Sequence, residues 1–95
     1  MKLNVGTRIF NGGDMANPEH FGTITNIITG RFGTQIEITP DEEAERKPYS
    51  VPPCMFSETY LGHGGTRFVT ESAYLEYREE QNANMKEWAR RVQNL

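Results

Sequence analysis

The chain has 95 residues, of which ten are basic and thirteen acidic for a net charge of −3, and it contains one cysteine. A chain of this length forms one domain with a single modest core, and its acidic balance argues against the phosphate affinity on which most nucleic-acid-binding domains depend. One cysteine excludes an internal disulfide, and no run approaches the apolar stretch of a signal peptide or the roughly 20 apolar residues of a membrane span. We therefore expect a cytoplasmic protein that does not enter the membrane.

The first predicted element is a short strand near the N-terminus. Leu3, Val5, Thr7 and Ile9 share one face of an extended segment, which is the period-two pattern of a half-buried strand. Residues 11–21 follow with an Asn-Gly-Gly turn signal and a proline, which together predict an exposed loop.

The centre of the chain predicts a β-hairpin on which the other segments pack. Residues 22–28 and 34–39 are rich in isoleucine and threonine, whose branched side chains favour strands, and glycines lie at their edges. Alternation places Ile36 and Ile38 on one apolar face, and it places Ile24 and Ile28 together on one face of the first strand.

The segment after the hairpin predicts connections and short strands. Residues 40–48 begin and end with proline and carry charges without apolar periodicity, which predicts a loop whose acidic side chains are solvated. We also expect a strand at 49–51, an apolar plug at 54–56, a single helical turn near 57–59 and a last strand at 66–69.

The C-terminal segment predicts a helix that begins after Thr70. Thr70 is a favourable N-cap, and Glu71 in the first turn suits the helix dipole. Residues 81–84 interrupt an apolar stripe that consists of Tyr74, Tyr77, Met85, Trp88, Val92 and Leu95. We expect residues 71–80 to pack on the sheet and part of 84–95 to face another chain.

The order of strands, turns and loops resembles that of the SH3-like small barrels, especially the KOW and Tudor-like kind. The resemblance spans roughly residues 3–56 and rests on Gly6-Thr7-Arg8-Ile9 and on Phe21-Gly22-Thr23-Ile24-Thr25-Asn26-Ile27. It implies a mainly β fold in which residues 1–69 form an SH3-like barrel of four to five strands. Residues 70–95 then add a C-terminal α-helix that packs on the barrel or extends from it. KOW-type barrels often bind RNA or ribosomal and transcription proteins, but this chain lacks the basic character of the RNA binders.

The loop after the first strand gathers polar side chains that could form one wall of a ligand groove. Asp14, Asn17 and His20 supply a carboxylate, an amide and an imidazole. The alternative is that Asp14 and Asn17 hydrogen-bond their own backbone in turns, as short polar side chains do, and that His20 packs beside Phe21.

Two other places carry candidate binding groups. His63 stands in a glycine-rich turn, where it is simply exposed or acts with Arg67, which could pair with a phosphate or carboxylate. Arg31 and Phe32 at the predicted hairpin tip could stack on a base or grip a protein, unless Phe32 folds back onto the barrel.

No group of residues has the spacing of a catalytic or metal site. Cys54, His20 and His63 lack the paired cysteines or the helical His spacing of a zinc site. Two prolines precede Cys54 and apolar residues follow it, a context that is typical of a buried thiol and not of a nucleophile. We therefore expect no enzyme activity, no metal and no cofactor.

These features favour a non-enzymatic protein-binding module, because the chain is small and acidic and carries interface-type apolar residues on an appended helix. A small accessory or inhibitory protein of a phage or mobile element fits this description. The partner is another protein, or a second copy bound through the helix. The alternative is a nucleic-acid-binding KOW-type domain that uses Arg8, Arg31 and Arg67. The residues expected at partner-binding surfaces are Asp14, Asn17, His20, Arg31, Phe32, His63, Arg67, Met85, Trp88 and Val92.

Overall fold

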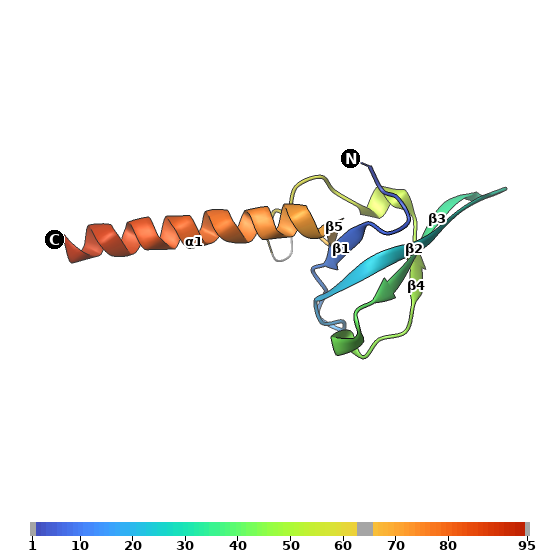
Figure 1. Ribbon diagram of the computed structural model, residues 1–95, viewed down its shortest axis with the longest axis horizontal. Coiled ribbons are helices and arrows are strands. Elements are labelled where there is room, and N and C mark those ends of the chain that lie inside the picture. The colour runs from blue at the N-terminus through green and yellow to red at the C-terminus, as the bar shows by residue number, and fades with distance from the viewer. Residues whose placement is uncertain (1, 63–65, 95) are drawn as a thin grey trace.

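The computed structural model describes residues 2–62 and 66–94. Within these residues it contains five strands, two short 3-10 helices and one long helix. The strands are β1 (Arg8–Asn11), β2 (His20–Gly30), β3 (Gly33–Pro40), β4 (Tyr49–Val51) and β5 (Phe68–Thr70), and the helix is α1 (Glu71–Gln93). Figure 1 shows a β-sheet at one end of the molecule and α1 extending away from it, which accounts for the elongated dimensions of 62 × 27 × 23 Å.

All five strands belong to one antiparallel sheet with the order β4-β3-β2-β1-β5. Strands β4 and β5 are therefore its two edges, and the sheet is not closed between them within the described residues. The predicted mainly β fold with a C-terminal helix is confirmed. The sheet by itself does not establish the predicted barrel.

The hairpin of β2 and β3 is confirmed, but a β-bulge changes which isoleucines face the core. Ile24 pairs with Ile38 and Ile27 pairs with Ile36, and the register shifts between Ile24 and Asn26. An extra residue in one strand reverses the alternation beyond it. Ile24 is consequently fully buried whereas Ile28 is 47% exposed, so the prediction that these two share a face was wrong.

The first strand begins later than predicted, at Arg8 instead of Leu3. A turn interrupts the predicted alternation, because Gly6 adopts a positive φ of 95° that side-chain-bearing residues rarely adopt. The Gly6 amide still donates to the Ile24 carbonyl oxygen at 2.7 Å, and the Ile24 amide donates to Thr7 at 2.9 Å. Residues 6–7 thus continue the contact with β2 without regular strand geometry, and Val5 is exposed.

Successive residues of β1 point to opposite faces of the sheet and join two different apolar clusters. Ile9 belongs to a cluster with residues of the hairpin, and its fully or nearly fully buried members are Ile9, Ile24, Ile36, Ile38, Phe56 and Phe68. Phe10 belongs to the second cluster, where Tyr60 and Val69 are also buried and where Tyr74 and Tyr77 of α1 pack. The second cluster is what attaches the helix to the sheet.

The connection from β3 to β5 departs from the prediction in several places. One 3-10 helix, η1 (Glu42–Ala44), lies inside the charged segment, and the second, η2 (Pro53–Met55), replaces the turn that was expected near residues 57–59. The apolar plug is confirmed only for Phe56, which is buried. Cys54 is exposed, because the single turn of η2 buries none of its side chains, so the prediction of a buried thiol was wrong.

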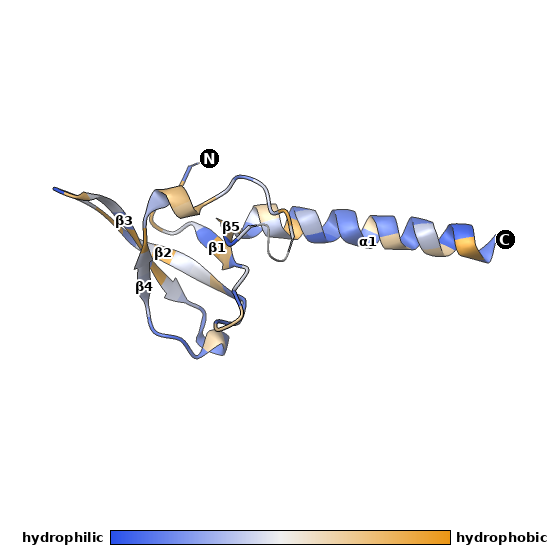
Figure 2. Ribbon diagram, turned by 180° about the vertical axis from the view of Figure 1, so that it is seen from behind, coloured by the Kyte–Doolittle hydropathy of each residue, from blue (hydrophilic) through white to orange (hydrophobic). Residues whose placement is uncertain are grey.

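Helix α1 is confirmed from its cap onward. The Thr70 hydroxyl oxygen accepts a hydrogen bond from the Ala73 amide at 3.2 Å, which satisfies one of the free amides of the first turn. The helix runs without a break through residues 81–84, and every residue from Arg78 to Asn94 is exposed. Figure 2 shows that this part is largely hydrophilic, with hydrophobic positions near its C-terminal end. No helix in the described part of the chain has the length and apolar content to cross a bilayer.

Candidate functional site

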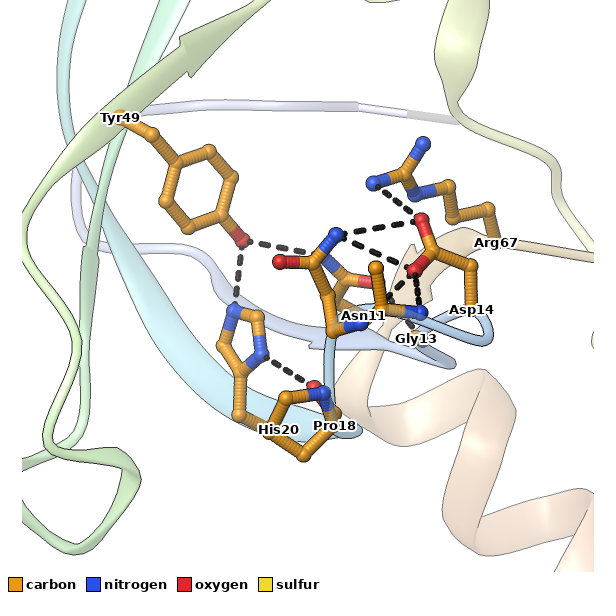
Figure 3. Close-up of polar contacts among 9 residues, drawn as sticks. Asn11, Gly13, Asp14, Pro18, His20, Tyr49 and Arg67 are labelled. Atoms are coloured by element: carbon orange, nitrogen blue, oxygen red, sulfur yellow. Dashed lines mark hydrogen bonds and ion pairs between the residues drawn. The ribbon is translucent and has the colours of Figure 1, made fainter.

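A buried polar chain joins β1, the start of β2 and β4 (Figure 3). His20 Nε2 lies 2.8 Å from the Tyr49 hydroxyl oxygen, and His20 Nδ1 lies 3.1 Å from the Pro18 carbonyl oxygen. A carbonyl oxygen only accepts, so His20 Nδ1 donates to Pro18, and Nε2 is left to pair with the Tyr49 hydroxyl. Asn11 Nδ2 donates to the Tyr49 oxygen at 3.4 Å, while Asn11 Oδ1 accepts from the Gly13 amide at 2.8 Å.

In this chain of hydrogen bonds, both ring nitrogens of His20 have partners within the protein. The residue is also buried, and these are the contacts of the packing alternative for His20. Burial raises the pKa of the Tyr49 hydroxyl above its usual value, against the opposing effects of Asn11, Arg46 and Arg67. Tyr49 therefore remains a neutral donor at physiological pH.

The loop between β1 and β2 is organised by the Asp14 carboxylate. Asp14 Oδ1 accepts from the Ala16 and Asn17 amides, each at 2.8 Å, and from Asn17 Nδ2 at 3.1 Å. The bonds from Ala16 and Asn17 lower the Asp14 pKa, and the positive charge of Arg67 adds to the shift. The turn-forming alternative for Asp14 and Asn17 therefore describes their observed contacts.

Arg67 is brought to the same loop from the segment before β5. Its Nη2 lies 3.2 Å from Asp14 Oδ2, as Figure 3 shows, and its guanidinium carbon lies 5.6 Å from the centre of the Phe68 ring. Of the predicted site residues, the fold thus gathers Asp14, Asn17, His20 and Arg67 on the side of the sheet where the β1–β2 loop meets β4.

A second charged group fixes the start of α1 to the sheet. The Arg8 guanidinium donates through Nη1 and Nη2 to the two carboxylate oxygens of Asp41, at 2.5 and 2.6 Å, and its Nη2 lies 3.0 Å from Glu71 Oε2. The hydrogen bonds from Arg8 lower the Asp41 pKa, and the same pairing raises the pKa of the guanidinium. Asp41 is therefore an exception to the prediction that the acids of residues 40–48 are solvated.

The hairpin tip and the C-terminal helix lie at opposite ends of the molecule (Figure 1). Phe32 is 96% exposed, so it does not fold back on the sheet, and the Arg31 guanidinium lies 5.9 Å from its ring centre. Met85, Trp88 and Val92 are 69%, 67% and 46% exposed. The nine predicted positions that the structure describes therefore do not form one site. They separate into the β1–β2 loop with Arg67 beside it, the hairpin tip and the helix.

The two remaining expectations concern His63 and a metal site. His63 lies outside the described residues. Among residues 2–62 and 66–94, no three histidine, cysteine, aspartate or glutamate side chains are grouped closely enough to hold a metal ion.

Two residues that matter at the β4 side were not among the predicted site residues. Tyr49 was expected only as part of a short strand, and Arg46 was expected in a solvated charged loop, yet its guanidinium carbon lies 4.9 Å from the Tyr49 ring centre. The contact between Arg46 and Tyr49 is local, since three positions separate them, whereas their closeness to Arg67 and Phe68 depends on how the two edges of the sheet approach each other.

Comparison with known proteins gives no identification for this fold and these surfaces. No protein-family model, no curated protein and no solved structure matches the chain.

Proposed function

We propose that the chain is a non-enzymatic protein-binding module that engages its partner through the projecting part of α1. The observation that carries the proposal is that residues 78–94, which we call the α1 arm, are exposed along their whole length although they include Met85, Trp88 and Val92. In proteins most of the stability of a helix comes from packing of its apolar face against other elements, and the described chain offers the α1 arm no such packing. Apolar side chains on such a helix, and tryptophan above all, are typical anchors of interfaces.

The spacing of the anchors suits a helical partner. Met85, Trp88 and Val92 are separated by three and four residues, which is the narrow seam by which helices pair in coiled coils.

The charges along α1 favour a second copy as that partner, with the two helices antiparallel. Residues 71–80 carry four acidic side chains and one basic side chain, whereas residues 81–94 carry three basic and one acidic. Antiparallel pairing sets each basic half against an acidic half, and parallel pairing would set like charges together. Two of these four acidic residues, Glu76 and Glu80, line a cavity of about 170 Å³ beside the base of the helix, where the basic half of the other copy would lie.

The first test is the solution mass of the full-length protein and of Trp88→Ala, measured by light scattering. The proposal predicts a dimer that Trp88→Ala weakens by tenfold or more, since interface tryptophans commonly contribute about 2 kcal/mol or more. Phe32→Ala is the matched control, because it removes another exposed aromatic ring at the other end of the molecule. A Trp88→Ala protein that dimerises as well as the control would overturn the proposal.

Reversing charges on α1 tests whether the two helices of the dimer are antiparallel. Lys86→Glu with Arg90→Glu makes the second half of α1 acidic, which repels the acidic half in an antiparallel dimer but leaves a parallel dimer with like charges as before. We expect this double variant to be monomeric and to form a mixed dimer with a copy carrying Glu76→Lys and Glu80→Lys. A double variant that still self-associates fully would exclude the antiparallel arrangement.

We also infer that the open sheet is a variation on the SH3-like small barrel. Support comes from the antiparallel order in which β1 lies between β2 and β5, and from the closeness of the two edges, since the Tyr49 and Phe68 ring centres are 6.2 Å apart. A binding module of this size is compatible with the small accessory or inhibitory role expected from the sequence.

The nucleic-acid alternative receives support only at the hairpin tip, where Arg31 and Phe32 are exposed. The other two arginines that this alternative invokes already form ion pairs. Arg8 pairs with Asp41 and Glu71, and Arg67 pairs with Asp14. Binding to a single-stranded oligonucleotide that weakened steeply with salt and was lost in Arg31→Ala would favour this alternative instead.

A further inference from the structure

A cavity of about 290 Å³ lies between the two edge strands of the sheet. Tyr49 and Val51 of β4 line one side and Phe68 of β5 lines the other, although four strand pairings separate β4 from β5 along the sheet. We call it the edge pocket. It occupies the place where the sheet does not close, and its volume is near the lower end of small-molecule sites.

Two arginines enter this pocket, and no carboxylate lines it among the described residues. Arg46 lies over the Tyr49 ring and Arg67 over the Phe68 ring, with guanidinium carbons 4.9 and 5.6 Å from the ring centres. Stacking on an aromatic face holds a guanidinium in place while leaving the N–H groups in its plane free for an acceptor.

Each of these guanidinium groups has a buried nitrogen without a hydrogen-bond partner among the described residues, Nη1 of Arg46 and Nε of Arg67. A buried donor left without an acceptor destabilises a protein, and a charged donor does so more strongly. The two donors belong to side chains of like charge that line one cavity, which favours an anion as the missing acceptor.

The net charge of the residues at the edge pocket indicates which kind of anion it would bind. Arg67 is already paired through Nη2 with Asp14 at 3.2 Å, whereas Arg46 has no ion pair in the described structure. The two arginines and Asp14 together therefore carry one net positive charge, which matches a monoanion better than a phosphate dianion. Val51, Met55 and Phe68 give the pocket apolar walls.

We propose that the edge pocket binds a carboxylate with an apolar body, whose oxygens accept hydrogen bonds from Arg46 and Arg67. The carboxylate belongs to a small organic acid or to the C-terminus of a peptide. This inference goes beyond the proposed function, because it uses the sheet edges and not the α1 arm, and either can fail without the other.

The test is a titration of the ¹⁵N-labelled full-length protein with sodium benzoate, followed through the arginine Nε–Hε signals by NMR. We expect the Arg67 signal to shift and to saturate with benzoate but not with benzamide, which has the same shape without the charge. Arg46→Gln should weaken binding by about tenfold or more, as expected for loss of a charge-assisted hydrogen bond. Arg31→Gln, which removes an arginine at the hairpin tip, is the charge-matched control and should bind benzoate normally.

Further titrations distinguish between the kinds of ligand that the edge pocket could bind. Sodium phosphate should bind more weakly than benzoate to the natural chain, and Asp14→Asn, which raises the local charge, should shift the preference toward phosphate. A tripeptide with a free C-terminal carboxylate, compared with its amide, shows whether a peptide or a small acid binds more tightly, and both results support the proposal. Absence of a saturable shift, unchanged binding in Arg46→Gln, or tighter binding of phosphate than benzoate would each overturn it.

Discussion

The attachment of α1 to the sheet depends on Tyr74, and its replacement by alanine is the most informative stability experiment. The Tyr74 ring stacks on Phe10 with centres 3.7 Å apart and lies edge-on to Phe21 and Tyr60 at 5.7 and 5.2 Å. Full burial of an aromatic ring makes its truncation cost about 3–5 kcal/mol. Because Tyr74 is only partly buried, we expect about 2–3 kcal/mol, which moves a urea midpoint by roughly 1–2 M for a domain of this size.

Leu75→Ala is the matched control, since Leu75 is the next residue on the same helix but points to solvent. Alanine has the higher helix propensity in both cases, so without tertiary contacts both variants would be neutral or slightly stabilising. Urea unfolding followed by circular dichroism, at one fixed protein concentration, measures the difference. Equal midpoints for Tyr74→Ala and Leu75→Ala would refute the attachment of the helix through the Phe10 cluster.

Other positions give separate tests. Gly13→Ala should cost about 2 kcal/mol or more in urea unfolding, because φ is +72° there and an added Cβ would lie 2.5 Å from the Asn17 carbonyl oxygen; an unchanged midpoint would show that the loop differs from the description. Arg8 lowers the Asp41 pKa, so the stability from this pair is complete above about pH 4 and is lost as the pH falls through the lower native pKa. Asp41→Asn should therefore be less stable by about 1 kcal/mol at pH 7 and should lose less stability between about pH 4 and 2 than the natural chain, and an identical pH profile would contradict this. Cys54 should be alkylated by iodoacetamide in the native protein about as fast as in urea, since it is exposed; strong protection would contradict its placement on η2.

The local signals of the sequence were sufficient for the elements whose stability is local. Thr70 as a helix cap and the isoleucine and threonine runs of the hairpin describe β2, β3 and the start of α1 well. The same is true of Asp14 and Asn17, whose turn chemistry depends on neighbouring amides.

The features that depend on tertiary structure were not predictable in this way. The bulge after Ile24 changes the face of Ile28, and no alternation pattern reveals where an extra residue enters a strand. Arg46 and Arg67 are 21 positions apart in sequence and share a cavity only because the edges of the sheet approach each other. The length of α1 and the packing of only its first part were expected, but the residue at which α1 leaves the sheet depends on how much surface the small sheet offers.

We propose above that the α1 arm binds a protein and that this protein is a second copy of the chain. The most direct measurement is the light-scattering mass of the full-length protein at concentrations up to about 0.1 mM, well above the micromolar dissociation constants of many small interfaces. Pairing through α1 predicts a mass twice the 10.9 kDa of the chain, falling toward 10.9 kDa on dilution. A mass of 10.9 kDa at every concentration would contradict pairing with a second copy.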